Sequence, residues 1–237
     1  MDGHGGHSDQ SVNPKAAGPS GSDGKSAKNG RGQAESNIYG LLATAYRQEV
    51  TSEFLQQLRD PEFLEILSDL GIQLTSDFLQ KPEEELLDDL AVEFAGLFLG
   101  PGGHISPHES VHHQRDGVEG GMLWGETTAE VKKFIEAAGL DYSPEYTGLP
   151  DHISVELEFM EALARHEEQA WSVDDEEEAF RCLDMERRFL EEHLSRWVPA
   201  FCDKVMATAE LSFYRELAGL TKRFIEFDWQ ELQEVEE

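Results

Sequence analysis

The sequence predicts an all-α protein, a single helical bundle of about nine or ten helices that follows a disordered N-terminal tail. Along most of the chain, apolar residues recur at intervals of three and four, as they do on one face of an α-helix. Residue types that begin and end helices flank these apolar runs. No segment alternates apolar and polar residues over the length of a strand, and no hairpin turn joins two such segments.

The tail is predicted at residues 1–36, which are rich in Gly, Ser, Asp, Lys, Asn and His and contain almost no large apolar side chain. Such a segment cannot bury enough apolar surface to offset the entropy lost on ordering. The folded domain is predicted at residues 37–230, with a possible sub-division near residues 115–126. Its length and the hydrophobic content of the chain are sufficient to fill one core.

The first half of the domain contains apolar helical runs that start near Ile38 and are separated by turn signals. The residues that open or close these helices are Asp60-Pro61, Gly71, Pro82 and Gly100-Pro101. Three glutamates follow Pro82, where negative charge favours the positive end of the helix dipole. We therefore expect one of these helices to begin at Pro82 and end at Gly100.

The second half resumes the helical pattern after a polar loop. Its boundary signals are Gly139, Pro150-Asp151, Asp174-Asp175-Glu176 and Pro199. The helix that starts at Asp174 is expected to end at Pro199, because proline lacks the N–H that continues a helix. One or two further helices follow.

The composition limits the partners and the cellular location that we expect. With 49 acidic and 19 basic residues, the net charge of −30 disfavours binding to nucleic acid or to anionic lipid and favours a basic partner. No apolar run approaches the roughly 18 residues of a membrane span, and no signal peptide is recognisable at the N-terminus. We therefore expect a cytoplasmic protein without stable membrane insertion, in which Cys182 and Cys202 are reduced.

The sequence contains no Gly-rich phosphate loop, no GxSxG, no HExxH and no CxxC motif. We therefore predict no catalytic residues and no cofactor. A histidine-rich loop between Gly100 and Gly125 leaves one alternative open. His108 and His112 would share a face if this loop were helical, as metal ligands can, but Pro107 argues against a regular helix. Histidines that contact the backbone or a client are the preferred interpretation, and no metal is predicted.

A second group of residues lies in the string PDHISVELEFM. Asp151 is placed to cap a helix, and His152 and Glu156 are four residues apart on it. A capped helix with an intrahelical His–Glu pair would explain this spacing without any function. The alternative is that these polar groups face a groove.

The string EFAGLFLGPGGHISPHESVH contains an apolar helix end followed by Gly-Pro and then by Pro-x-Glu-Ser. About 50 residues later, from Pro150 to Met160, Pro-Asp-His is followed by Glu-Leu-x-Phe-Met. These two strings together resemble the two hallmarks of the TorD/DmsD family of molybdoenzyme-specific chaperones. The similarity extends from about Ile38 to Phe227. The sequence departs from the pattern at Phe94, where some relatives have Trp, and at His112, near a common aromatic position.

This resemblance implies an all-helical, TorD-like chaperone that is not an enzyme. Members bind the twin-arginine signal peptide or the apo form of a molybdopterin-dependent oxidoreductase, aid cofactor insertion and prevent premature export, as monomers or domain-swapped dimers. The client-binding positions that it implies are Phe94, Leu97, Phe98, Gly100, Pro101, Pro107, Glu109, Ser110, Pro150, Asp151, His152 and Glu156.

These residue types suit such a client. A twin-arginine signal combines paired guanidinium groups with an apolar segment, so its binder needs both carboxylates and an apolar groove. Asp151, Glu109 and Glu156 are the candidate carboxylates. Two alternatives remain, a helical metal-dependent enzyme that uses the histidine-rich loop, and an assembly adaptor that binds its client independently of the signal.

Overall fold

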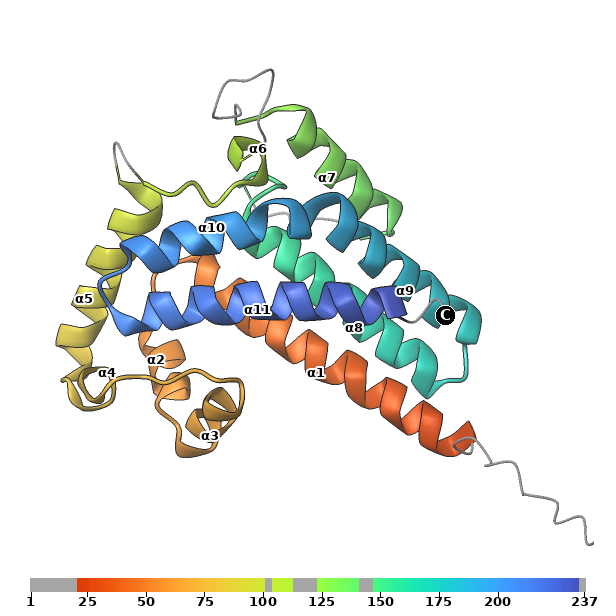
Figure 1. Cartoon of the computed structure of the whole chain (residues 1–237), viewed down its shortest axis with the longest axis horizontal. Helices are drawn as coiled ribbons and strands as arrows, with labels where there is room; N and C mark the ends of the chain where they lie inside the picture. Colours follow the sequence, from red (N-terminus) through yellow and green to blue (C-terminus); the bar gives the residue numbers. More distant parts are fainter. Residues whose placement is uncertain (1–20, 101–103, 113–122, 141–146, 235–237) are drawn as a thin grey trace, which may run out of the picture.

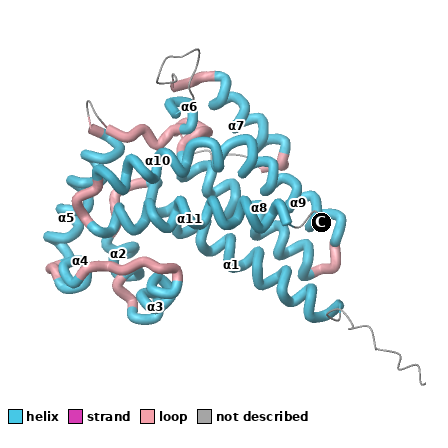
Figure 2. Tube along the Cα trace, in the orientation of Figure 1, coloured by secondary structure: helices cyan, strands magenta, loops and turns pink. Residues whose placement is uncertain are grey.

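The computed structural model describes residues 21–100, 104–112, 123–140 and 147–234, and these residues form helices joined by loops (Figures 1 and 2). No strand occurs in these four ranges. Two π-helical turns continue the helices before them, so the described residues form ten continuous helices. The prediction of an all-α protein is confirmed.

The first half of the described chain contains α1 (Gly21–Arg47), α2 (Ser52–Leu58), α3 (Pro61–Asp69), α4 (Ser76–Gln80), α5 (Glu83–Phe94) and the π-helical turn η1 (Ala95–Leu99). The second half contains α6 (Glu109–His112), α7 (Glu126–Ala137), α8 (Ile153–Ser172), α9 (Glu176–Phe189), the π-helical turn η2 (Leu190–Leu194), α10 (Ser195–Thr208) and α11 (Ser212–Glu234).

Long helices form the body of the molecule, and short ones gather at one end. α1 packs along α8, α8 along α9, and α10 along α11. Figure 1 shows α2 to α5 together at the end opposite the C-terminus, whereas α6 and α7 lie on one side of the bundle. The start of α8 and the end of α5 therefore lie on the same half of the molecule, although they are far apart in the sequence.

Local signals set several helix boundaries as the sequence predicts. Asp60 caps α3, accepting hydrogen bonds from the backbone N–H groups of Glu62 and Phe63, and Pro61 is its first residue. Gly71 and Gly139 follow helix ends with φ of 78° and 77°, in the left-handed region that glycine adopts without steric cost.

A cluster of aromatic rings forms the core at the end of α5. Phe98 packs against Phe94, Tyr46, Phe201 and Tyr214, with ring centroids 5.1 to 6.2 Å apart. All five side chains are buried. Because these rings come from α1, α5, η1, α10 and α11, they fix the end of α5 against the long helices.

The predicted boundary of the tail at Ser36 is wrong, because α1 already includes residues 21–36. Polar contacts and a close helix approach order this segment in place of apolar burial. Arg31 donates to Glu35 at 2.6 Å and to Asp228 of α11 at 3.3 Å. At Gly32, an added Cβ would lie 3.0 Å from the carbonyl oxygen of Ala164, so glycine allows α1 to approach α8 closely. Residues 1–20 of the predicted tail lie outside the described residues.

The predicted helix end at Pro199 is also wrong. η2 and α10 continue α9 as far as Thr208, with Pro199 inside α10. Proline removes one backbone hydrogen bond from the helix. The neighbouring side chains of Trp197, Val198 and Phe201 are nevertheless at most 1% exposed, and their burial holds this segment in the core.

The predicted sub-division near 115–126 falls mainly on residues outside the described ranges. None of the described helices has the length and apolar character that crossing a membrane requires.

Candidate functional site

The two sequence motifs lie against each other through their backbones. An isolated antiparallel bridge pairs His108 with His152. The N–H of Ile153 donates to the carbonyl of Pro107 at 2.8 Å, and the N–H of Glu109 donates to the carbonyl of Asp151 at 2.9 Å. The loop after η1 is therefore fastened to the start of α8.

The side chain of Asp151 strengthens this connection. Its Oδ2 accepts a hydrogen bond from the N–H of Ser110 at 3.0 Å, and the residue is 0% exposed. The expectation that Asp151 caps α8 is wrong, because His152 is the N-cap residue and its Nδ1 accepts from the N–H of Ser154 at 3.1 Å. Asp151 is thus hydrogen-bonded to the backbone of α6, whereas His152 caps the start of α8.

Two further carboxylates lie in the interior behind the motifs. His193 Nδ1 contacts Glu109 Oε2 at 2.9 Å, and Trp197 Nε1 donates to Glu156 Oε2 at 3.1 Å. The side chain of Glu156 is therefore bonded to Trp197 of α10 rather than to the imidazole of His152, contrary to the intrahelical pair considered from the spacing. Burial, with the neighbouring carboxylate of Glu109, raises the pKa of Glu156 well above its ordinary value. A protonated Glu156 is neutral and can share the interior with Glu109.

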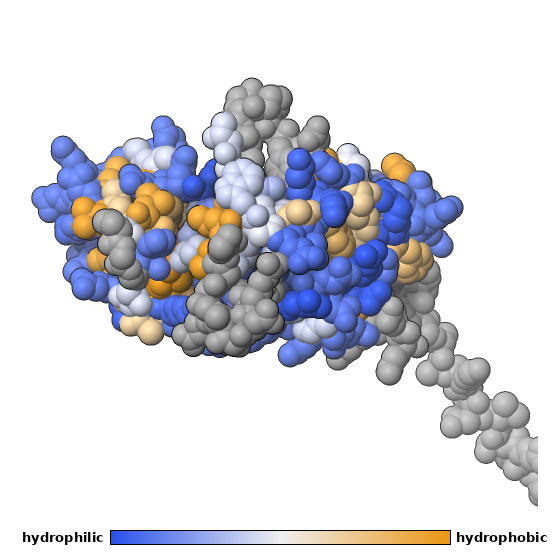
Figure 3. Space-filling model, turned by 90° about the horizontal axis from the view of Figure 1, so that it is seen from above, coloured by the Kyte–Doolittle hydropathy of each residue, from blue (hydrophilic) through white to orange (hydrophobic). Residues whose placement is uncertain are grey.

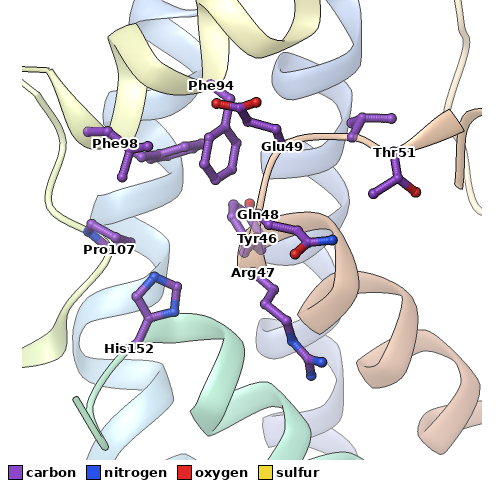
Figure 4. Close-up of a pocket in the computed structure, with 11 residues that line it drawn as sticks. Tyr46, Arg47, Gln48, Glu49, Thr51, Phe94, Phe98, Pro107 and His152 are labelled. Carbon is purple, nitrogen blue, oxygen red and sulfur yellow. The ribbon is translucent and has the colours of Figure 1, made fainter. Parts of the chain in front are cut away.

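A cavity of about 500 Å³ opens beside the joined motifs (Figure 4). Its lining comes from the end of α1 and the α1–α2 connection, from α5 and η1, from the loop after η1 and from the start of α8. The lining residues are Tyr46, Arg47, Gln48, Glu49, Val50, Thr51, Phe94, Phe98, Leu99, Pro107 and His152. We call this cavity the motif pocket.

The motif pocket combines apolar and acidic groups. Phe94 and Phe98 are largely buried, and Figure 4 shows their rings on the side of the pocket opposite His152. Leu99 is 64% exposed. Glu49 is exposed and has no ion-pair partner among the residues that the structure describes. Figure 3, seen from the side of α6, shows apolar surface gathered at the end of the molecule that carries α5.

The imidazole of His152 faces the motif pocket as a neutral group. Burial, with a smaller contribution from His108, lowers the pKa of His152 to about 4. The two rings are 5.0 Å apart in an edge-to-face arrangement. Since Nδ1 of His152 accepts from Ser154, protonation there would remove the helix cap. The ring therefore contributes a polar but uncharged surface to the pocket near pH 7.

Four of the predicted binding residues line the motif pocket, namely Phe94, Phe98, Pro107 and His152. Five others are buried outside its lining, namely Leu97, Glu109, Ser110, Asp151 and Glu156. Gly100 ends η1 and Pro150 precedes the start of α8, whereas Pro101 lies outside the described residues. Direct peptide contact by these twelve residues stays a prediction.

Sequence reasoning missed one wall of the motif pocket, the segment from Tyr46 to Thr51. It contributes Arg47, Gln48 and Glu49, which are polar residues at a helix end. Such residues are common on any surface, so nothing in this stretch of sequence marks a site. Only the packing of α1 along α8, and of Tyr46 against Phe98 of η1, brings them to the pocket.

The histidines of the loop contact neighbouring protein groups. His112 Nε2 lies 2.7 Å from the carbonyl oxygen of Ser106, and its ring stacks on Trp197 at 5.1 Å. His108 packs on His152. Within the described part of the loop, no three His, Cys, Asp or Glu side chains converge closely enough to hold a metal ion. His113 lies outside the described residues.

The nitrate reductase delta subunit family model matches residues 48–203 of the chain, a span that includes both motifs. The chain belongs to this family. Similar relatives include the chaperone protein TorD of a Psychrobacter species, which is 28% identical over 219 residues, or 86% of this chain and 94% of the relative. The chaperone protein TorD of Photobacterium profundum is 26% identical over 209 residues, covering 83% of this chain and 93% of its own.

A third relative, the chaperone protein TorD of Shewanella pealeana, is 24% identical over 214 residues, which cover 85% of this chain and 90% of the relative. These matches extend beyond the two motifs to most of the helical body. The predictions of a TorD-family chaperone, and of a chaperone rather than an enzyme, are confirmed by these comparisons.

Proposed function

We propose that this member of the family is a cytoplasmic chaperone for a molybdopterin-dependent oxidoreductase, and that it binds the twin-arginine signal peptide of that enzyme in the motif pocket. The observation that carries the proposal is the position of the pocket, at the point where the two motifs are bonded to each other. A pocket there draws its lining from both motifs, so a peptide bound in it would contact both.

The chemistry of the pocket suits a peptide with cationic and apolar parts. Glu49 is an exposed carboxylate on one wall, and Arg47 of the same wall is paired with Glu158. A guanidinium group can form two charge-assisted hydrogen bonds with one carboxylate. Phe94, Phe98 and Leu99 offer apolar surface beside it. The net charge of −30 would also attract a basic peptide over a distance.

The buried carboxylates act on the peptide indirectly in this proposal. Asp151, Glu109 and Glu156 are each 0% exposed and bonded to neighbouring protein groups. Unpairing a buried carboxylate is costly, so these side chains stay in the interior when the peptide binds. Their role is to hold the loop after η1 against α8, which fixes the shape of the pocket.

The test is a titration of the full chain with a fluorescent synthetic peptide that carries two adjacent arginines followed by an apolar segment. A matched peptide with two lysines is the specificity control, because lysine cannot form the bidentate contact. We expect saturable binding that weakens with salt and is tighter for the arginine peptide. Failure of both peptides to bind at low salt would overturn the proposal.

Substitutions at exposed positions test which part of the surface binds the peptide. Leu99→Ser removes apolar surface at the motif pocket, whereas Val173→Ser does so at a similarly exposed position (73%) at the end of α8. Weaker binding by the first variant alone supports the motif pocket. The signal-independent adaptor alternative predicts instead that a client enzyme without its leader binds as well as the complete one.

A further inference from the structure

A second group of titratable side chains lies in the interior, far along the bundle from the motif pocket. Glu35 of α1, Glu167 of α8 and Glu186 of α9 each place one carboxylate oxygen within 4.8 Å of the others. Asp228 of α11 adjoins them through Arg31, which contacts both Asp228 and Glu35. All four carboxylates are at most 6% exposed. We call these four residues the carboxylate cluster.

The donors around the carboxylate cluster satisfy only part of it. Arg31 donates to Glu35, the hydroxyl of Tyr39 donates to Asp228 at 2.5 Å, and the indole N–H of Trp171 donates to Glu167 at 2.8 Å. Arg31 also acts electrostatically on Glu186, against the repulsion of Glu167, Asp228 and Glu35.

Within the carboxylate cluster, Glu186 has a carboxylate oxygen to which no hydrogen-bond donor is directed. It is 1% exposed, and its buried Oε1 has no hydrogen-bond partner. Glu186 reaches the group from α9 and is aimed at the oxygens of Glu35 and Glu167. A buried carboxylate oxygen without a partner is costly unless a proton or a cation occupies the space in front of it.

We propose that Glu35, Glu167 and Glu186 form a binding site for a hard divalent cation, such as Mn²⁺ or Mg²⁺, that joins α1, α8 and α9. Oxygen-only ligands select hard cations. Metal–oxygen bonds are roughly 2.0 to 2.4 Å long, so two ligands of one ion lie at most about twice that distance apart. Three carboxylate oxygens that all lie within 4.8 Å of one another can therefore bind the same ion. A divalent cation would also offset negative charge of the carboxylates that bind it.

A cation at this site would attach the N-terminal half of α1, which has few apolar residues, to α8 and α9. Glu35 lies one turn after Arg31, within the segment that its composition predicts as a tail. A bound cation would link Glu35 of α1 to Glu167 of α8 and Glu186 of α9, and so hold the start of α1 against the bundle.

The test uses the full chain after chelation and removal of the chelator. Mn²⁺ is titrated in moderate salt, free Mn²⁺ is followed by electron paramagnetic resonance, and the melting temperature is measured with and without Mn²⁺ or Mg²⁺. We expect one tightly bound Mn²⁺ per chain, displacement by excess Mg²⁺, and a higher melting temperature. Absence of tight binding and of any thermal shift would overturn the proposal in favour of a protonated cluster.

Two matched variants distinguish the carboxylate cluster from the acidic surface. Glu186→Gln should weaken Mn²⁺ binding at least about tenfold, because an amide is a poorer ligand than a carboxylate. Glu177→Gln makes the same charge change at an exposed position of α9 and should leave binding unchanged. Equal binding by both variants would assign the ion to the surface and overturn the proposal. If Glu186→Gln does not fold, Glu35→Gln takes its place.

Discussion

The carboxylate of Asp151 accepts a hydrogen bond from the backbone N–H of Ser110 at 3.0 Å, and this contact between residues 41 positions apart joins the two motifs. Both residues are buried. The contact explains why a motif in a loop and a motif at a helix start can act together, since displacement of either changes the lining of the motif pocket.

Asp151→Ala should therefore weaken both the fold and peptide binding. Loss of the acceptor leaves the Ser110 N–H buried without its partner, at a cost of about 1 to 3 kcal/mol. Urea denaturation and peptide titration measure the two effects. The exposed Asp184→Ala on α9 is the control. Unchanged affinity per folded molecule would limit Asp151 to a structural role unrelated to the pocket.

Glu156→Gln should preserve the fold, because a neutral amide matches the protonated carboxyl and still accepts from Trp197. The raised pKa of Glu156 means that its contribution to stability is complete below the ordinary value of 4.5 and is lost as pH rises toward the folded-state value. The stability of Glu156→Gln relative to the native chain should therefore increase from pH 5 to pH 8, roughly the range of common denaturation buffers. A constant difference across this range would mean that Glu156 is ionised.

His152→Asn should remove an acid-sensitive step in stability. The pKa of His152 falls from 6.5 to about 4 on folding, so its contribution is present above 6.5 and is lost as pH falls through 4. This shift corresponds to about 3 kcal/mol at most. Asparagine retains a helix cap without titrating. His166→Asn, at an exposed position of α8, should leave the pH profile of the melting temperature unchanged.

Glu49→Gln tests the charge on the rim of the motif pocket. An exposed ion pair contributes about 1 kcal/mol, so we expect about fivefold weaker binding of the arginine peptide and a shallower salt dependence. Glu177→Gln removes the same negative charge at an exposed position of α9, and so separates this local effect from general attraction. Identical losses in the two variants would contradict a contact at Glu49.

Gly32→Leu compared with Gly30→Leu tests whether α1 docks on α8 before Ser36. Both changes replace a helical glycine, so both gain helix propensity of about 0.5 to 1 kcal/mol. A Cβ at Gly32 meets the Ala164 carbonyl at 3.0 Å, whereas a Cβ at Gly30 meets nothing within 4 Å. Only Gly32→Leu should destabilise the protein in urea, by about 1 to 3 kcal/mol. Equal stability of the two variants would mean that residues 30–36 do not pack on α8 and belong to the tail.

Much of the fold could be predicted from local sequence signals. Apolar spacing gave the helices, and Asp60, Gly71 and Gly139 marked boundaries that the structure has. The helix end predicted at Pro199 was wrong, because burial of the neighbouring side chains stabilises the helix by more than the one missing hydrogen bond costs. The start of α1 was missed because its partners, Asp228 among them, are distant in the sequence.

The sequence by itself determined the fold class, the positions of the two motifs and, through them, the family. Such features are local, since periodicity and motif spacing are properties of neighbouring residues. Only the tertiary structure decided that Asp151, Glu109 and Glu156 are interior groups, that residues 46–51 complete the motif pocket, and that Glu35, Glu167 and Glu186 converge. Burial and convergence depend on how helices distant in sequence pack together, and no single stretch of sequence encodes that packing.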